Sequence, residues 1–142
     1  MEILDKNIKY ITGLGALNIT GADWHLLDNI RTGNWPVSGV DYADTTGLFG
    51  AKGLRPCGAF LRTIGNDTGN LMCASPARAI ADMVYHNIFV LKHYPDHVIF
   101  KDYLLEDEDI DEFMEYFAVM LANAQTQEKA LLFRWQDEFI KR

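Results

Sequence analysis

The sequence predicts an α+β fold, in which a small antiparallel sheet from the N-terminal half packs against helices from the C-terminal half. The first observation is that all 11 glycines lie before Asn70, among short apolar runs and turn formers that are typical of strands and loops. The second is that, from Ala74 onward, apolar residues recur at helical spacing and glycine is absent. No linker-like composition separates the halves, so we expect residues 1–142 to form one domain.

Short elements are expected near the N-terminus. Residues 9–12 favour a short strand. Residues 13–19 fit either a strand or a helix that Thr12 caps and Gly21 ends, and the pattern does not decide between them. Asp23 is placed to cap a further short helix.

A hairpin is expected in the middle of the chain. Residues 58–64 alternate enough, through Phe60, Arg62 and Ile64, to predict a strand. Residues 65–70 then read as a turn into residues 71–74.

The segment from Ser75 onward is the clearest helix signal in the chain. Ser75 can cap the free amides of the first turn, and Pro76 suits the first helical position because its missing N–H would have no partner there. Arg78 and Asp82 are four residues apart, and we interpret them as an ion pair that holds the helix against the sheet, worth about 0.3 to 0.5 kcal/mol if exposed. One face of this helix is apolar and consists of Ile80, Met83 and Val84.

Two more helices are expected, joined near residues 123–126, although one unbroken helix also fits the pattern. The first begins near Asp109 and carries an apolar stripe of Ile110, Phe113, Met114, Phe117 and Leu121. The second carries Leu131 or Leu132, Trp135 and Phe139. We interpret the aromatic residues of both stripes as an internal core in preference to an oligomer interface, and the sequence leaves the oligomeric state open.

The segment Glu106–Glu112 is strongly acidic. Its position at the start of a predicted helix offers a simple explanation, because the helix dipole stabilises negative charge there by about 0.3 to 1 kcal/mol per group. The alternative is an acidic docking surface for a basic protein.

Composition limits the classes of partner. The formal net charge of -7 disfavours a broad surface for binding nucleic acid. No apolar run is long enough to span a membrane, and residues 1–10 do not resemble a secretory signal. The two cysteines, Cys57 and Cys73, are too few for a disulfide framework, so we expect core thiols and a cytoplasmic location.

The residues do not assemble a recognisable catalytic or metal-binding motif. His93 and His97 have helical spacing, but Pro95 between them disfavours the helix that would bring both rings to one ion, so we expect no metal and no other cofactor. No Gly-x-Ser-x-Gly nucleophile motif occurs, and no catalytic residue is assigned.

The cluster Asp23, Trp24 and His25 places a carboxylate and an imidazole around a large aromatic side chain. The simplest interpretation is a turn anchored by a buried tryptophan. The alternatives are a proton-transfer pair or a platform for binding a partner.

Four segments together carry a resemblance to known families: 10–19 (Tyr-Ile-Thr-Gly-Leu-Gly-Ala-Leu-Asn-Ile), 23–25, 48–50 (Leu-Phe-Gly) and 74–84 (Ala-Ser-Pro-Ala-Arg-Ala-Ile-Ala-Asp-Met-Val). They resemble a small, functionally uncharacterised bacterial family with a Tyr-Leu-Thr-Gly-x-His-Ala-Leu-Asn-Ile opening and a Gly-Asp-Trp-His motif. Their order is also similar to that of the C-terminal domain of type IV (abortive-infection) antitoxins.

The sequence departs from these families at three positions. Gly15 stands where the bacterial family has histidine, Ala22 where glycine is usual, and Ala77 where the antitoxin helix has glutamate.

The resemblance implies a non-enzymatic, protein-binding domain that regulates a toxin or phage-defence partner, such as a nucleotidyltransferase-like toxin. Its partner-binding candidates are Asp23, Trp24, His25, Arg78 and Asp82. The alternative is a small enzyme or ligand-binding domain that uses Asp23 and His25.

Overall fold

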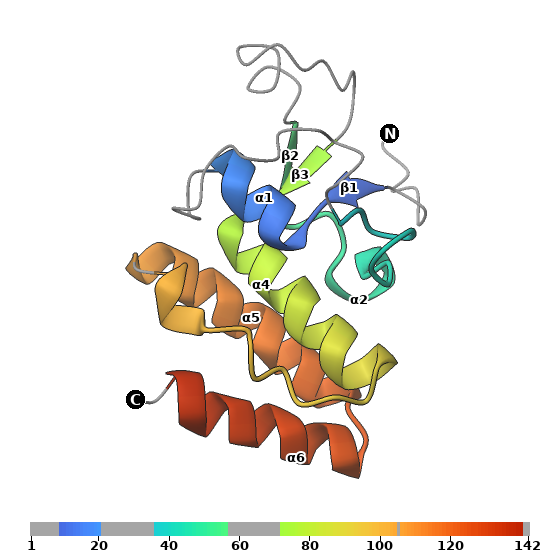
Figure 1. The fold of residues 1–142 in the computed structure, drawn as a ribbon, viewed down its shortest axis with the longest axis vertical. Helices are drawn as coiled ribbons and strands as arrows, with labels where there is room; N and C mark the ends of the chain where they lie inside the picture. The colour runs from blue at the N-terminus through green and yellow to red at the C-terminus, as the bar shows by residue number, and fades with distance from the viewer. Residues whose placement is uncertain (1–8, 21–35, 57–71, 105, 141–142) are drawn as a thin grey trace.

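The structure is a computed structural model, which describes residues 9–20, 36–56, 72–104 and 106–140 (Figure 1). The expected α+β class is confirmed, with strands in the N-terminal half and most helices in the C-terminal half. The elements are, in chain order, β1 (Tyr10–Ile11), α1 (Gly13–Thr20), α2 (Thr46–Phe49), β2 (Leu54–Pro56), β3 (Met72–Ala74), α4 (Pro76–Tyr85), the π-helix η2 (His86–Val90), the 3-10 helix η3 (Phe100–Asp102), α5 (Asp107–Asn123), α6 (Thr126–Trp135) and the π-helix η4 (Gln136–Ile140).

The sheet has the strand order β1-β3-β2 and is mixed. β2 and β3 are antiparallel, with Arg55 opposite Cys73. β1 and β3 are parallel, with Ile11 opposite Cys73, so this pair differs from the antiparallel sheet that we expected. A parallel pair needs a long connection, and here that connection includes α1, α2 and β2.

The open question at residues 13–19 has a clear answer, because strand β1 is followed by helix α1, which begins at Gly13. Gly13 has a φ of +63°, in the left-handed region that favours glycine. The predicted helix after Asp23, the predicted strand 58–64 and the turn 65–70 lie outside the described residues.

Helix α4 begins as the sequence predicts. The Arg78 backbone N–H donates to Ser75 Oγ at 3.1 Å, and Pro76 occupies the first helical turn. The predicted apolar residues Ile80, Met83 and Val84 are buried. The helix runs without interruption into η2.

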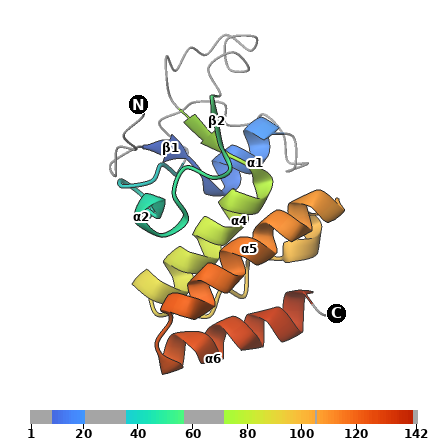
Figure 2. The ribbon, with the colours of Figure 1, turned by 180° about the vertical axis from the view of Figure 1, so that it is seen from behind.

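The helices α4, α5 and α6 stack below the sheet, and each lies farther from the sheet than the helix before it in the chain (Figures 1 and 2). Both ribbon views show α4 beneath β1, β3 and α1, then α5 against α4, and finally α6 at the end farthest from the sheet (Figures 1 and 2). α5 ends at Asn123 and α6 begins at Thr126, so the predicted junction is confirmed. The Gln125 backbone N–H donates to Glu128 Oε1 at 2.8 Å and fixes the start of α6.

In the described part of the chain, no helix is both long enough and apolar enough to cross a membrane.

Candidate functional site

The structure describes two of the five residues that the sequence analysis singles out. Asp23, Trp24 and His25 lie outside the described residues. Arg78 and Asp82 lie one turn apart on α4, with Arg78 Nε 3.2 Å from Asp82 Oδ1, so the predicted ion pair is present.

The pair is buried, so the small stabilisation that applies to an exposed pair does not apply to it. The side chain of Arg78 is 0% exposed and that of Asp82 is 1% exposed. The reason is that residues of β1 and of the segment 45–52 cover the polar face of α4, so a molecule docking on the surface does not reach either side chain.

The carboxylate of Asp82 is fully occupied by protein donors. Oδ2 accepts hydrogen bonds from Tyr10 OH and Thr12 Oγ1, both at 2.7 Å. Oδ1 accepts from Thr45 Oγ1 at 2.7 Å and from Arg78 Nε. Four donors match the four lone-pair positions of a carboxylate.

The guanidinium of Arg78 is equally occupied, because its five N–H groups find five acceptors. Besides the bond from Nε, Nη1 donates to the carbonyl oxygens of Gly50 (3.0 Å) and Lys52 (2.7 Å). Nη2 donates to Tyr10 OH (3.0 Å) and Thr45 Oγ1 (2.9 Å).

Aromatic rings complete the enclosure of the cation. The central carbon of the Arg78 guanidinium lies 5.0 Å from the Tyr10 ring centroid, 5.1 Å from that of Phe49 and 5.9 Å from that of Tyr116. Faces of aromatic rings attract a desolvated cation, which adds to the electrostatic stabilisation of this site.

Two groups of the cluster, Tyr10 and Arg78, have raised pKa values. Burial, together with the Asp82 carboxylate, raises the pKa of Tyr10 well above its usual range. Burial acts to lower the pKa of Arg78, but Asp82 and Tyr10 outweigh it, so the net pKa is raised. Tyr10 and Arg78 therefore keep their protons at neutral pH, and neither can serve there as a general base.

We call Tyr10, Thr12, Thr45, Arg78 and Asp82 the buried clasp, since they connect β1, the segment before α2, and α4. Sequence reasoning assigned Thr12 only a capping role and gave no role to Thr45. The only available signal was that Tyr10 and Thr12 belong to the same family-like segment, and nothing in the sequence places Thr45 beside Asp82.

A second polar cluster lies next to the buried clasp. Glu112 Oε2 accepts hydrogen bonds from Ser75 Oγ and from Tyr116 OH, both at 2.6 Å. A Cβ added to Gly53 would lie 2.5 Å from Tyr116 OH and 2.8 Å from Glu112 Oε2, so these side chains would have to shift to admit it. Gly53 also has a φ of +82°, which favours glycine independently.

An open groove of about 680 Å³ runs beside this second cluster, between β2 with the residues before it and the N-terminal half of α5. We call it the β2–α5 groove. Its lining residues are Lys52, Gly53, Leu54, Arg55, Glu108, Asp111, Glu112 and Glu115.

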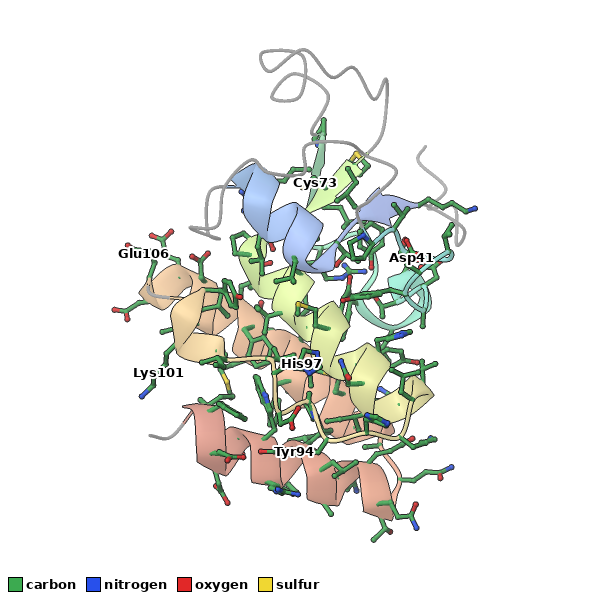
Figure 3. The ribbon with its side chains drawn as sticks, viewed as in Figure 1. Asp41, Cys73, Tyr94, His97, Lys101 and Glu106 are labelled. Carbon is green, nitrogen blue, oxygen red and sulfur yellow. The ribbon has the colours of Figure 1, made fainter. Side chains whose placement is uncertain are left out.

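The two walls of the groove carry opposite charge. The α5 wall presents four carboxylates at helical spacing, whereas the other wall presents Lys52 and Arg55. Lys52 forms an exposed ion pair with Glu115 across the groove. The start of α5 within the acidic run is as predicted, and Glu106 precedes its first turn (Figure 3). Nothing in the amino-acid sequence places Glu108, Asp111 and Glu112 opposite β2.

Among the residues that the structure describes, no group of three or more His, Cys, Asp or Glu side chains is arranged to hold a metal ion. His97 is largely exposed beside Asp96, and Cys73 is buried on β3.

Comparison with known proteins gives no match: no family model, no curated protein and no solved structure is similar to this chain at a significant level.

Proposed function

We propose that this chain is a non-enzymatic, cytoplasmic, antitoxin-like domain that binds a protein partner, and that the β2–α5 groove receives a basic surface of that partner. The single observation that carries this proposal is the groove with its wall of four carboxylates. The motif resemblance supports the antitoxin-like part of the proposal.

The state of the buried clasp supports a binding role over a catalytic one. Arg78 and Asp82 are the charged side chains of α4. Every hydrogen-bond donor and acceptor of both is engaged within the protein. A catalytic acid, base or electrostatic stabiliser needs an atom that reaches the substrate. The clasp therefore supports the fold that presents the groove.

Electrostatics favour a basic partner. The four carboxylates of the groove outnumber its two cations, and the whole chain carries a formal charge of -7. Such a field accelerates the approach of a positively charged protein and repels acidic ones.

The direct test is co-expression with the product of the neighbouring gene. We expect that product to arrest growth when expressed alone, and to be neutralised by this chain and retained by it on an affinity column. A neighbouring product that is harmless alone and is not retained would contradict the antitoxin-like proposal.

The groove is tested by charge reversal in the same retention assay. We expect the double variant Glu108→Lys/Asp111→Lys to bind on the order of tenfold more weakly, mainly through slower association, because two attractive groove charges become repulsive. Asp96→Lys is compared with the single variant Asp111→Lys, so that both change the net charge equally; Asp96 is 80% exposed and is not among the groove residues. Equal weakening by the control would show that net charge, and not the groove, governs binding.

A further inference from the structure

His86 contacts the loop that supplies Thr45 to the buried clasp. It is the first residue of η2, directly after α4, and its imidazole Nδ1 accepts a hydrogen bond from the Ala43 backbone N–H at 3.3 Å. Its ring stacks on Tyr42, with ring centroids 4.8 Å apart and planes 10° apart. Both contacts attach residues 42 and 43 to the end of α4.

The hydrogen bond fixes the protonation state that the contact requires. An imidazole nitrogen accepts an N–H only when it carries no proton, so the ring is neutral with its hydrogen on Nε2. A doubly protonated ring would place two N–H groups against each other at Ala43, and the bond would be lost.

We propose that His86 is a pH-sensitive latch: protonation of its ring releases residues 41–44 from α4 and so loosens the loop that positions Thr45 in the buried clasp. This inference does not depend on the proposed partner binding, because it concerns the opposite end of α4 from Ser75 and the groove.

The loop connects the latch to the clasp over a very short distance in sequence. Ala43 is two residues from Thr45, whose hydroxyl donates to Asp82 and accepts from Arg78. On the other side, Gly39 N–H donates to the Tyr42 carbonyl oxygen at 2.7 Å and closes the turn before the latch. When Ala43 is released, the loop keeps the turn hydrogen bonds of residues 37–42 and the contacts of Asp44 and Thr45, but loses its hydrogen bond to the end of α4.

Titratable groups belong to both elements that meet at His86, the loop and α4. Tyr42 faces the ring, and its pKa is raised to about 12 by burial and by Asp82 and Asp41, so it is neutral. Asp41 (Figure 3) and Asp44 belong to the loop, and Asp82 lies one turn earlier on α4. A stacked aromatic ring and nearby negative charge both favour an imidazolium.

Burial works in the other direction and prevails. It lowers the pKa of His86 below its ordinary value. The carboxylate of Asp82 is already shared among four donors, and Asp44 Oδ1 accepts from the Thr46 backbone N–H and hydroxyl, which reduces their pull on an imidazolium.

The direction of the pH effect follows from linkage. The released loop leaves His86 with an ordinary pKa of about 6.5, whereas the closed loop depresses it, so the released state binds more protons. The latch is therefore fully closed above this value and opens progressively as the pH falls below it.

The test is amide hydrogen exchange of residues 41–44, expressed as protection factors to remove the intrinsic pH dependence of exchange. In the wild type we expect protection to fall several-fold between about pH 8 and about pH 5. In His86→Gln, whose side chain does not titrate, we expect no pH-dependent fall. His93→Gln and His97→Gln are matched controls on the segment after η2, and both retain the wild-type response.

Two outcomes would overturn the latch. One is protection at residues 41–44 that is independent of pH in the wild type, and the other is an undiminished pH response in His86→Gln. If that variant does not fold, NMR titration of the His86 ring in the wild type decides the question: a pKa above the ordinary value overturns the latch, and a lower one supports it.

Discussion

At the scale of single residues, Arg78 decides how α4 is held in the molecule. A buried charge is costly unless all of its hydrogen bonds are made, and the structure meets this condition for both members of the pair. The hydrogen bonds come from residues far apart in the sequence, so they form only when β1, the loop before α2, and α4 are in place together. The pair thus favours this one arrangement of the three segments.

We predict that Arg78→Met destabilises the protein by about 3 to 5 kcal/mol, because it leaves the Asp82 charge buried without its counterion. Urea denaturation measures the change in unfolding free energy. Lys52→Met is the control: it removes a cation of similar length from the exposed pair with Glu115, and we expect a loss of less than about 1 kcal/mol.

A double variant separates the pair from its surroundings. Asp82→Leu should also be strongly destabilising, and Arg78→Met/Asp82→Leu should cost clearly less than the sum of the two single changes, since neither charge is then stranded. Additive losses would mean that the two charges do not stabilise each other.

At the scale of elements, the start of α4 and the turn before β2 depend on each other. Ser75 caps α4 and donates to Glu112, while its backbone N–H donates to the Gly53 carbonyl oxygen at 2.6 Å. The turn therefore passes directly over the helix start, and Gly53 is the residue that allows this close approach.

We predict that Gly53→Ala lowers stability by more than about 1 kcal/mol, because the new methyl group collides with Tyr116 and Glu112 at a left-handed backbone position. Gly47→Ala is the matched control. Gly47 lies in α2, its φ is not in the left-handed region, and an added Cβ meets nothing within 4 Å, so we expect no loss and a gain of up to about 1 kcal/mol. Thermal unfolding of both variants provides the measurement.

The sequence predicted best those elements whose signals are local. Ser75 and Pro76 predicted the start of α4, and the apolar periodicity of residues 110–121 predicted α5. Both signals are local, because capping and amphipathic spacing are properties of neighbouring residues. The parallel pairing of β1 with β3 was not predictable in this way. Each strand has only two or three residues, and their pairing depends on contacts across a long connection.

In the candidate site too, the locally determined feature was predictable and the features that depend on tertiary packing were not. The i, i+4 spacing of Arg78 and Asp82 predicted their ion pair, but spacing on one helix carries no information about what covers that helix. Burial, the role of Thr45 and the groove opposite Glu108 and Asp111 all arise from tertiary packing.

At the scale of the whole molecule, an aromatic cluster joins the C-terminal elements to one another. Phe113 of α5 lies 5.0 Å from Phe100 of η3 and 5.6 Å from Trp135 of α6, between ring centroids. The Trp135 indole N–H donates to the Val98 carbonyl oxygen at 3.0 Å, and this hydrogen bond attaches the segment before η3 to α6. The interpretation of these aromatic residues as an internal core is confirmed for Phe113, Phe117 and Trp135, all nearly fully buried.

This cluster helps to hold α6, which lies outermost in the stack (Figure 2) and is also attached through the Lys92–Glu128 ion pair. We predict that Phe113→Ala costs about 3 to 5 kcal/mol, since it removes a fully buried ring at the point where α5, η3 and α6 meet. Phe133→Ala is the control within α6: Phe133 is 48% exposed, and we expect a change within about 0.5 kcal/mol. Urea denaturation followed by circular dichroism compares the two, and a similar loss in both variants would place the attachment of α6 elsewhere.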